Sequence, residues 1–303
     1  MRREARSDAV IEIVPEVARA LKGREPVVAL ETTLAAHGFP AGEGIEVALA
    51  AEQQVRDAGA VPATVGVLDG AVRVGLSQDQ LERFTADARK VGPRDLAACV
   101  VQGAVGATTV GGTLAACRAA GIGFMGTGGI GGVHRGGRLD VSGDLAELAR
   151  AEALVVCSGA KSFLDVPATM ELLETLGVPV LGYRTDVLPL FYAADGGPPV
   201  PARVESPDEA ARVARTHWGL RRHSALILAQ PPPESLDVEP LVEQALAAAE
   251  EEGISGPALT PYVLAFLHER SNGETLRVNR ELVLENARLA AHVAVAFGKI
   301  RDA

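Results

Sequence analysis

One lysine occupies a position that suits covalent chemistry. Lys161 follows an apolar run, Leu154 to Cys157, and three small residues, and the pattern after it predicts a helix from Ser162 to Leu176. Functional groups of α/β proteins gather at the carboxyl ends of such buried strands. Burial and a helix amino terminus both disfavour the ammonium form, and a neutral amine can attack a carbonyl to form a Schiff base. The alternative is a lysine whose charged end reaches solvent, as most lysines do.

A carboxyl group closes an earlier apolar run. Glu31 ends the strand expected from Pro26, and Thr32-Thr33 and His37 follow it. A carboxyl in apolar surroundings has a raised pKa and can act as a general acid. The alternative is a helix cap or an ion-pair partner, and the role of His37 is equally open.

Two segments have residue types that suit anions. Gly106 to Val110 precedes an expected helix, Thr109 to Ala120, so its amides and the hydroxyls of Thr108 and Thr109 could hold a phosphate. Simple capping of the helix by either threonine is the alternative. Lys90 lies nearby in the sequence and by itself reads as a surface lysine.

Asp140, Ser142 and Asp144 place oxygen-bearing side chains at alternate positions. In an extended backbone these side chains point the same way, and hard cations such as Mg²⁺ or Mn²⁺ prefer such ligands, with water completing the shell. The alternative is that Asp144 caps a helix, with Glu147 three residues later. Both can hold if Asp140 is the ligand.

The densest glycine region runs from Gly121 to Gly137 and contains a formal G-x-G-x-x-G at Gly126, Gly128 and Gly131. A dinucleotide site needs an amphipathic helix directly after this motif, and no helical pattern follows. The segment therefore predicts a loop of close backbone approach whose polar side chains are Thr127, His134 and Arg135.

Strand-like and helix-like segments alternate along the chain. Expected strands are 26–31, 62–68, 71–74, 123–125, 154–157, 178–181 and 224–229, and expected helices are 42–58, 109–120, 144–151, 162–176, 207–218, 236–252 and 260–297, the last one interrupted near 271–273. This alternation predicts an α/β fold, a three-layer α/β/α sandwich with a large, mostly parallel (mixed) sheet. With no repeat or linker, a single domain spans 1–303, and residues 1–9 are expected to be a disordered extension.

Composition limits the function. The chain has a net charge of −10 and 48% hydrophobic residues, which argues against binding nucleic acid polymers through a basic face. It contains no signal peptide pattern and no apolar run near the ~20 residues that span a bilayer, so no membrane partner is expected. Its three cysteines, in apolar segments without metal-ligand spacing, suggest a reduced, cytoplasmic protein.

These motifs together resemble the pseudouridine-5′-phosphate glycosidases, also called the indigoidine synthase A-like family. The matching stretches run in order from about residue 26 to 290: 29–33 with 36–38, 62–64 with 68–70, 90–91 with 94–96, 106–110, 127–136, 140–145, 158–162, 182–183, 279 and 286–287. The glycine–histidine–arginine loop and the GAKS motif are specific when they occur together. Two departures are Gly92-Pro93, where family members more often have serine and arginine, and a loop from His134 to Asp140 about two residues shorter.

The resemblance implies a reversible lyase that cleaves the C–C glycosidic bond of pseudouridine 5′-phosphate to ribose 5-phosphate and uracil, without an organic cofactor. Lys161 is similar to the nucleophile that forms an imine with C1 of the ring-opened ribose, Glu31 to the proton donor and acceptor, and Asp140 to the ligand of Mn²⁺, for which Mg²⁺ is possible. Residues similar to substrate-contacting positions are Lys90, Thr109, Val110, Thr127, His134, Ser142, Gly143, Asp144 and Asn279. The resemblance also suggests a homotrimer.

Two other functions fit part of the pattern. Another Schiff-base lyase, such as an aldolase acting on a sugar phosphate, would use Lys161 and a phosphate cradle but no uracil pocket. A non-catalytic sugar-phosphate-binding protein would need neither an acid nor a nucleophile, so the joint presence of Glu31, Lys161 and Asp140 argues against it.

Overall fold

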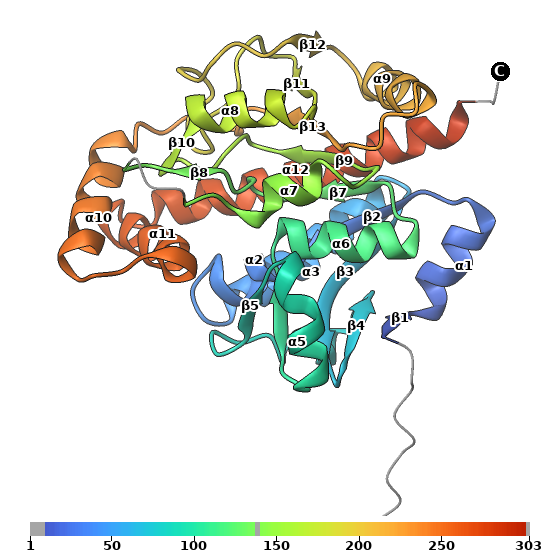
Figure 1. Cartoon of the computed structure of the whole chain (residues 1–303), viewed down its shortest axis with the longest axis horizontal. Coiled ribbons are helices and arrows are strands. Elements are labelled where there is room, and N and C mark those ends of the chain that lie inside the picture. Colours follow the sequence, from blue (N-terminus) through green and yellow to red (C-terminus); the bar gives the residue numbers. More distant parts are fainter. Residues whose placement is uncertain (1–9, 137–139, 301–303) are drawn as a thin grey trace, which may run out of the picture.

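The computed structural model describes residues 10–136 and 140–300 of the chain (Figure 1). Its strands are β1 (Ile11–Ile13), β2 (Val27–Glu31), β3 (Val61–Leu68), β4 (Ala71–Val74), β5 (Arg89–Val91), β6 (Gly106–Thr108), β7 (Phe124–Gly126), β8 (Val133–His134), β9 (Leu154–Cys157), β10 (Leu164–Asp165), β11 (Val180–Tyr183), β12 (Ala202–Val204) and β13 (Leu226–Ala229). Its α-helices are α1 (Pro15–Gly23), α2 (Thr33–His37), α3 (Glu43–Asp57), α4 (Gln78–Leu81), α5 (Leu96–Val101), α6 (Val110–Ala120), α7 (Gly143–Leu148), α8 (Val166–Thr175), α9 (Pro207–Gly219), α10 (Glu239–Glu251), α11 (Leu259–Arg270) and α12 (Glu274–Lys299). Two short 3₁₀ helices are η1 (Pro93–Asp95) and η2 (Gly256–Ala258). The expected disordered extension, 1–9, lies outside the described residues.

A large mixed sheet joins most of the strands. Its order is β1-β4-β3-β2-β7-β9-β13-β11-β12, with β6 beside β3 and β5 beside β6. The pairs β3–β4 and β3–β6 are antiparallel, whereas β2, β7, β9, β13, β11 and β12 run parallel to their neighbours. Residues on both faces of β2, β7, β9 and β13 are buried, which explains their continuous apolar runs.

Helices cover both faces of this sheet, as the alternating pattern predicted. α12 packs against α3, α9 and the central strands β2, β7 and β9. Figure 1 shows α6 and α7 on the opposite side of the sheet from α12. At Gly126, a Cβ would lie 2.9 Å from the Cα of Ala287, so only glycine allows α12 to approach β7 this closely. The fold is therefore the expected three-layer α/β/α arrangement.

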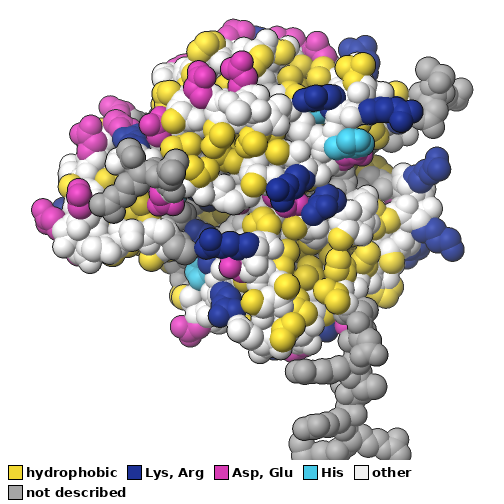
Figure 2. Space-filling view, viewed as in Figure 1, with side chains coloured by type: hydrophobic (Ala, Val, Ile, Leu, Met, Phe, Trp, Pro, Cys, Tyr) yellow, Lys and Arg dark blue, Asp and Glu magenta, His cyan; other side chains and the backbone are white. Residues whose placement is uncertain are grey.

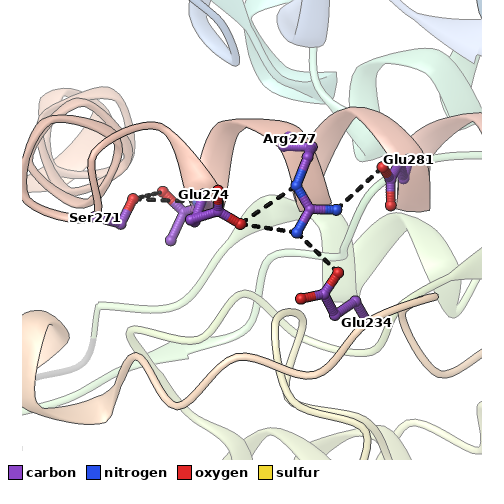
Figure 3. Close-up of polar contacts among 6 residues, drawn as sticks. Glu234, Ser271, Glu274, Arg277 and Glu281 are labelled. Carbon is purple, nitrogen blue, oxygen red and sulfur yellow. Dashed lines mark hydrogen bonds and ion pairs between the residues drawn. The ribbon is translucent and has the colours of Figure 1, made fainter.

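The start of α12 is tied to the chain before α10 by a charged cluster. Arg277 contacts Glu274 and Glu281 on its own helix and Glu234 from the preceding segment, and Figure 3 shows the guanidinium between these carboxylates. The three carboxylates hold the pKa of Arg277 above its ordinary value. Because the cluster is solvent-exposed, we expect it to orient the segment rather than to add much stability.

Several element predictions were wrong at their ends. The helix expected from Ser162 begins at Val166, and the strand expected at 178–181 is β11, Val180–Tyr183. The start of α8 is set by Asp165, whose carboxylate accepts the amide hydrogen of Ala168 at 3.0 Å, and by a proline in the first turn. Residues 164–165 instead form β10, which pairs with β8. The sequence patterns also missed the short elements β1, α1, α2, α4, β5, η1, α5, β6, β8, β12 and η2.

Candidate active site

Three strands that are neighbours in the sheet end at the same place. Glu31 is the last residue of β2, Thr127 directly follows β7, and Lys161 lies four residues after β9. β2 pairs with β7 and β7 with β9, all parallel, so their carboxyl ends share one edge. Ligands of open α/β sheets bind at this edge, which makes it the candidate active site.

A cavity of about 710 Å³ opens here. Lys161 lines it together with most residues expected to contact substrate or metal: Lys90, Thr109, His134, Asp140, Ser142, Gly143 and Asp144. Its wall also contains Thr33 and Arg94, which belong to the matching stretches but had no assigned role, and Phe163 and Thr260, which the sequence did not single out. The cavity is large enough for a nucleotide-sized ligand.

Glu31 is buried and held by a neighbour. The residue is 4% exposed, and its carboxylate accepts a hydrogen bond from the hydroxyl of Thr127. Burial raises the pKa of Glu31 to about 7, although the Lys161 ammonium and the Thr127 hydroxyl both act to lower it. A carboxyl with this pKa can either give or take a proton near neutrality.

Lys90 is the second amine of the cavity. It lies on β5, and β5 is held beside β6 at the edge of the sheet. The pKa of Lys90 is lowered to about 8, chiefly by burial and also by the nearby charge of Lys161, whereas Asp144 and Glu31 act to raise it. Lys90 and Lys161 line the cavity together with Asp144, and the buried Glu31 is close enough to act on the pKa of Lys90 although it is not among the lining residues.

Lys161 is not at a helix amino terminus. Its amide donates to the carbonyl of Ile130 at 3.3 Å, and its own carbonyl accepts from the amide of Leu164 at 3.0 Å. α8 begins five residues later, so the contribution that the sequence assigned to a helix dipole is absent at this position. Lys161 lies in a loop between β9 and β10 that the glycine-rich segment supports.

Two amides in the first turn of α6, those of Gly111 and Gly112, are already occupied. Thr109 is the N-cap of α6 and accepts from the amide of Gly112 at 3.3 Å, as the capping alternative predicted. The Asp144 carboxylate accepts from the amides of Gly111 at 2.8 Å and Gly131 at 3.0 Å and from the Thr109 hydroxyl at 3.1 Å. Val110, the first residue of α6, is buried beside this junction. Asp144 thus joins α6 to the glycine-rich loop.

Asp140 and Ser142 differ in what they offer a metal. Ser142, not Asp144, caps α7, and its hydroxyl accepts from the Asp144 amide at 3.2 Å. The side chain of Asp140 faces the cavity and is partly exposed. Within residues 10–136 and 140–300, no group of three His, Cys, Asp or Glu side chains could hold a metal ion. Because one carboxylate with water can still hold Mg²⁺ or Mn²⁺, the site fits a cation bound through Asp140 and solvent but not a closed protein cage.

His134 and Asn279 have different surroundings. His134, on β8, lines the cavity; burial lowers its pKa, and its buried Nδ1 has no hydrogen-bond partner among the described residues. Asn279 lies buried on α12, where its amide donates to the carbonyl of Gly38 at 3.3 Å. Asn279 is not among the described residues that line the cavity. Its buried Oδ1 has no hydrogen-bond partner in the described part of the chain.

One buried residue had no separate sequence signal. Asn286 on α12 is fully buried, and its amide donates to the carbonyl of Thr127 at 2.9 Å and to the hydroxyl of Ser158 at 3.1 Å. It thereby links the segment that holds Glu31 to the segment that leads to Lys161. Its only sequence indication was its membership of the family pattern.

Comparison with known proteins identifies the family. The profile described as indigoidine synthase A-like protein matches residues 16–296. The chain belongs to the indigoidine synthase A-like family. Relatives named pseudouridine-5′-phosphate glycosidase include those of Herpetosiphon aurantiacus, 47% identical over 94% of this chain and 97% of that protein, and of Streptomyces griseus, 49% identical over 94% and 92%.

Two solved structures share the fold of this chain. A crystal structure of the prealnumycin C-glycosynthase AlnA in complex with ribulose 5-phosphate superposes with a TM-score of 0.86, at 41% identity, over 96% of this chain and 98% of AlnA. An indigoidine synthase A-like protein from Thermotoga maritima superposes with a TM-score of 0.87, at 36% identity, over 99% and 100% of the two chains. No helix in the described part of this chain is long and apolar enough to cross a membrane.

Proposed function

We propose that this chain is a pseudouridine-5′-phosphate glycosidase, which cleaves the C–C bond between ribose and uracil and releases ribose 5-phosphate and uracil. The observation that carries the proposal is the convergence of three groups: Glu31 at the end of β2, Lys161 after β9 and Lys90 on β5, with both lysines close enough to act on the pKa of Glu31. The names of the family's relatives support the same substrate, and the AlnA complex supports a five-carbon sugar phosphate as ligand.

The chemistry explains why an acid and an amine are needed together. A C-glycosidic bond has no heteroatom leaving group, so protonation of the sugar alone achieves little. In the proposed reaction the Lys161 nitrogen bonds to C1, and the ring oxygen departs with a proton from Glu31. The new bond leaves the nitrogen positively charged, and it returns a proton to the Glu31 carboxylate. Its lone pair then forms the protonated imine as the bond between ribose C1 and uracil C5 breaks, and Glu31 gives that proton to uracil C5. Water hydrolyses the imine, releasing ribose 5-phosphate and restoring the amine.

The remaining cavity residues are assigned to binding. We expect Lys90 and Thr109, with the backbone at Val110 and Gly143, to contact the substrate, together with the side chains of Thr127, His134, Ser142 and Asn279. Asp144 already accepts three hydrogen bonds, so we expect it to act on the substrate through the backbone that it holds. Fixing the phosphate raises the effective concentration of C1 at the amine.

A divalent cation is the proposed cofactor. Asp140 would hold Mn²⁺ or Mg²⁺ together with water, and the cation would supply positive charge close to the phosphate or sugar oxygens. No organic cofactor is proposed, since the lysine nitrogen supplies the electron pair that forms the imine and uracil takes the pair of the broken bond.

Finer assignments complete the proposal. The enzyme is proposed to be a reversible lyase by reaction type and to assemble as a homotrimer in the cytoplasm. All three cysteines are buried and free, in keeping with a reducing compartment.

Borohydride trapping tests the proposal. Wild-type protein incubated with ribose 5-phosphate and borohydride should gain the mass of one reduced sugar phosphate adduct, and Lys161→Ala should gain none while remaining folded. Added uracil and Mn²⁺ should give pseudouridine 5′-phosphate. An adduct without this product would favour another Schiff-base lyase, and absence of any adduct would favour a binding protein. Unchanged labelling of Lys161→Ala would contradict the assignment of the nucleophile.

A further inference from the structure

The loop that carries Lys161 is not part of a helix, so other contacts must fix it. Its backbone meets the glycine-rich loop on one side, where the amides of Lys161 and Ile130 donate to the carbonyls of Ile130 and Gly159. The residues after Lys161 turn into β10, only two residues long. A catalytic amine needs a position fixed to within a fraction of an ångström.

Arg135 contacts this loop from the side away from the active-site cavity. Its Nη2 donates to the carbonyl of Ser162 at 2.9 Å and its Nε to the carbonyl of Leu164 at 3.3 Å. Both accepting residues lie within three positions of Lys161. The same guanidinium forms a two-point ion pair with Glu239, the first residue of α10.

The side chains of Arg135 and its neighbour His134 lie in different surroundings. β8 ends at His134, and Arg135 lies in the bend that follows it. His134 lines the cavity of Lys161, whereas Arg135 lines a different cavity of about 880 Å³ together with Ser162 and Glu239. Arg135 therefore reaches the nucleophile's loop from behind, without facing the substrate.

We propose that Arg135 is a positioning residue, a clamp that fixes Lys161 by holding the carbonyls of Ser162 and Leu164. A guanidinium suits this task because its planar fork offers several donors in fixed directions. That Arg135 holds the loop does not depend on the reaction that the enzyme catalyses. Only the expected effect on turnover rests on the proposed function. The clamp gives a role to the arginine of the glycine–histidine–arginine segment, whose side chain lines the other cavity.

Two variants separate the clamp from the ion pair. Arg135→Met removes the carbonyl contacts and the pairing with Glu239, whereas Glu239→Gln removes only the charge of a side chain that is 50% exposed. Arg135→Lys keeps a cation that can donate to one carbonyl but cannot reproduce the fork. Each is compared with wild type by kcat, by KM, by the rate of borohydride trapping with ribose 5-phosphate, and by amide hydrogen exchange of residues 158–165.

We expect Arg135→Met to lower kcat and the trapping rate about 10- to 100-fold with KM changed by less than about 3-fold, because a small misplacement of a reacting group costs rate rather than binding. Hydrogen exchange of 158–165 should accelerate. Glu239→Gln should stay within about 2-fold of wild type in every measurement, and Arg135→Lys should fall between the two.

Specific results would overturn the clamp. Wild-type exchange in 158–165 for Arg135→Met would show that the guanidinium does not hold the loop. If Glu239→Gln loses as much kcat as Arg135→Met, the ion pair with α10 and not the carbonyl contacts would explain the loss. If Arg135→Met does not fold, Arg135→Lys and Glu239→Gln still decide, because the clamp requires the lysine variant to be the slower one. Exchange needs no substrate, so faster exchange in Arg135→Met with no adduct in wild type would count against the proposed function and not against the clamp.

Discussion

Replacing Glu31 by glutamine should change how stability depends on pH. Glu31 is buried at 4% exposure, and its pKa is raised from 4.5 to about 7, chiefly by burial. In the unfolded chain the same carboxyl ionises near its ordinary value. Between these two pKa values the folded protein holds a proton that the unfolded chain has released. With respect to Glu31, the free energy of unfolding is therefore at its highest below pH 4.5, and it falls as pH rises through about 7.

The size of this loss follows from the shift. One pKa unit corresponds to about 1.4 kcal/mol, so ionising Glu31 in the folded protein costs about 3 kcal/mol relative to the unfolded chain. Glutamine keeps the shape of glutamate and an oxygen that can accept from Thr127, but carries no charge. The difference in the free energy of unfolding between Glu31→Gln and wild type should depend on pH. We expect it to favour the variant by up to about 3 kcal/mol more at pH 8.5 than at pH 4.5.

Urea unfolding at these two pH values measures the effect. Glu171→Gln, at an exposed position of α8, removes a carboxylate away from the cavity and serves as the matched control. Turnover of Glu31→Gln should fall by a factor of about 10² to 10⁴, the usual contribution of a general acid or base. If the stability difference between Glu31→Gln and wild type does not vary with pH, then Glu31 is not the desolvated acid described here.

Three further changes test other parts of the site. Thr127→Val removes a hydrogen bond that lowers the pKa of Glu31, so the limb of the kcat/KM profile near pH 7 should move up by about one unit; an unmoved limb would assign it to another group. Chelation should reduce turnover of wild type, with recovery on adding Mn²⁺, and Asp140→Asn should recover far less at the same Mn²⁺ concentration; full activity in chelator would argue against the metal. Gly131→Ala would place a Cβ 2.7 Å from Asp144 Oδ2, and we expect a loss of about 1–3 kcal/mol in the free energy of unfolding together with reduced turnover; wild-type values for both would show that the loop adjusts freely.

The layered fold could be predicted from the sequence because the patterns that indicate strands and helices lie within short segments. β-Branched and apolar runs such as 27–31, 61–68 and 154–157 predict strands by themselves, and their alternation with helical patterns predicts a covered parallel sheet. Short elements such as β5, β6 and β12 lack such runs. They exist because neighbouring strands complete their hydrogen bonds, which a local pattern does not report.

Asp144 shows the same limit within the site. Its type and spacing suggested a metal ligand or a helix cap, and in the folded chain its oxygens accept amides from Gly111 and Gly131, 33 and 13 positions away. The segment after Lys161 shows the same limit. Its composition predicts a helix from Ser162, but residues 164–165 form β10, which pairs with β8, and Asp165 caps a helix that begins only at Val166.

The sequence alone determined which residues have reactive groups and at which strand ends they lie, since residue type and periodicity are properties of short segments. Tertiary structure decided how the groups act. Burial raises the pKa of Glu31, Lys161 lies in a supported loop rather than at a helix end, and Arg135 faces away from the cavity that His134 lines. Desolvation and hydrogen bonding depend on which distant segments pack together, and that is settled only when the sheet and its helices assemble.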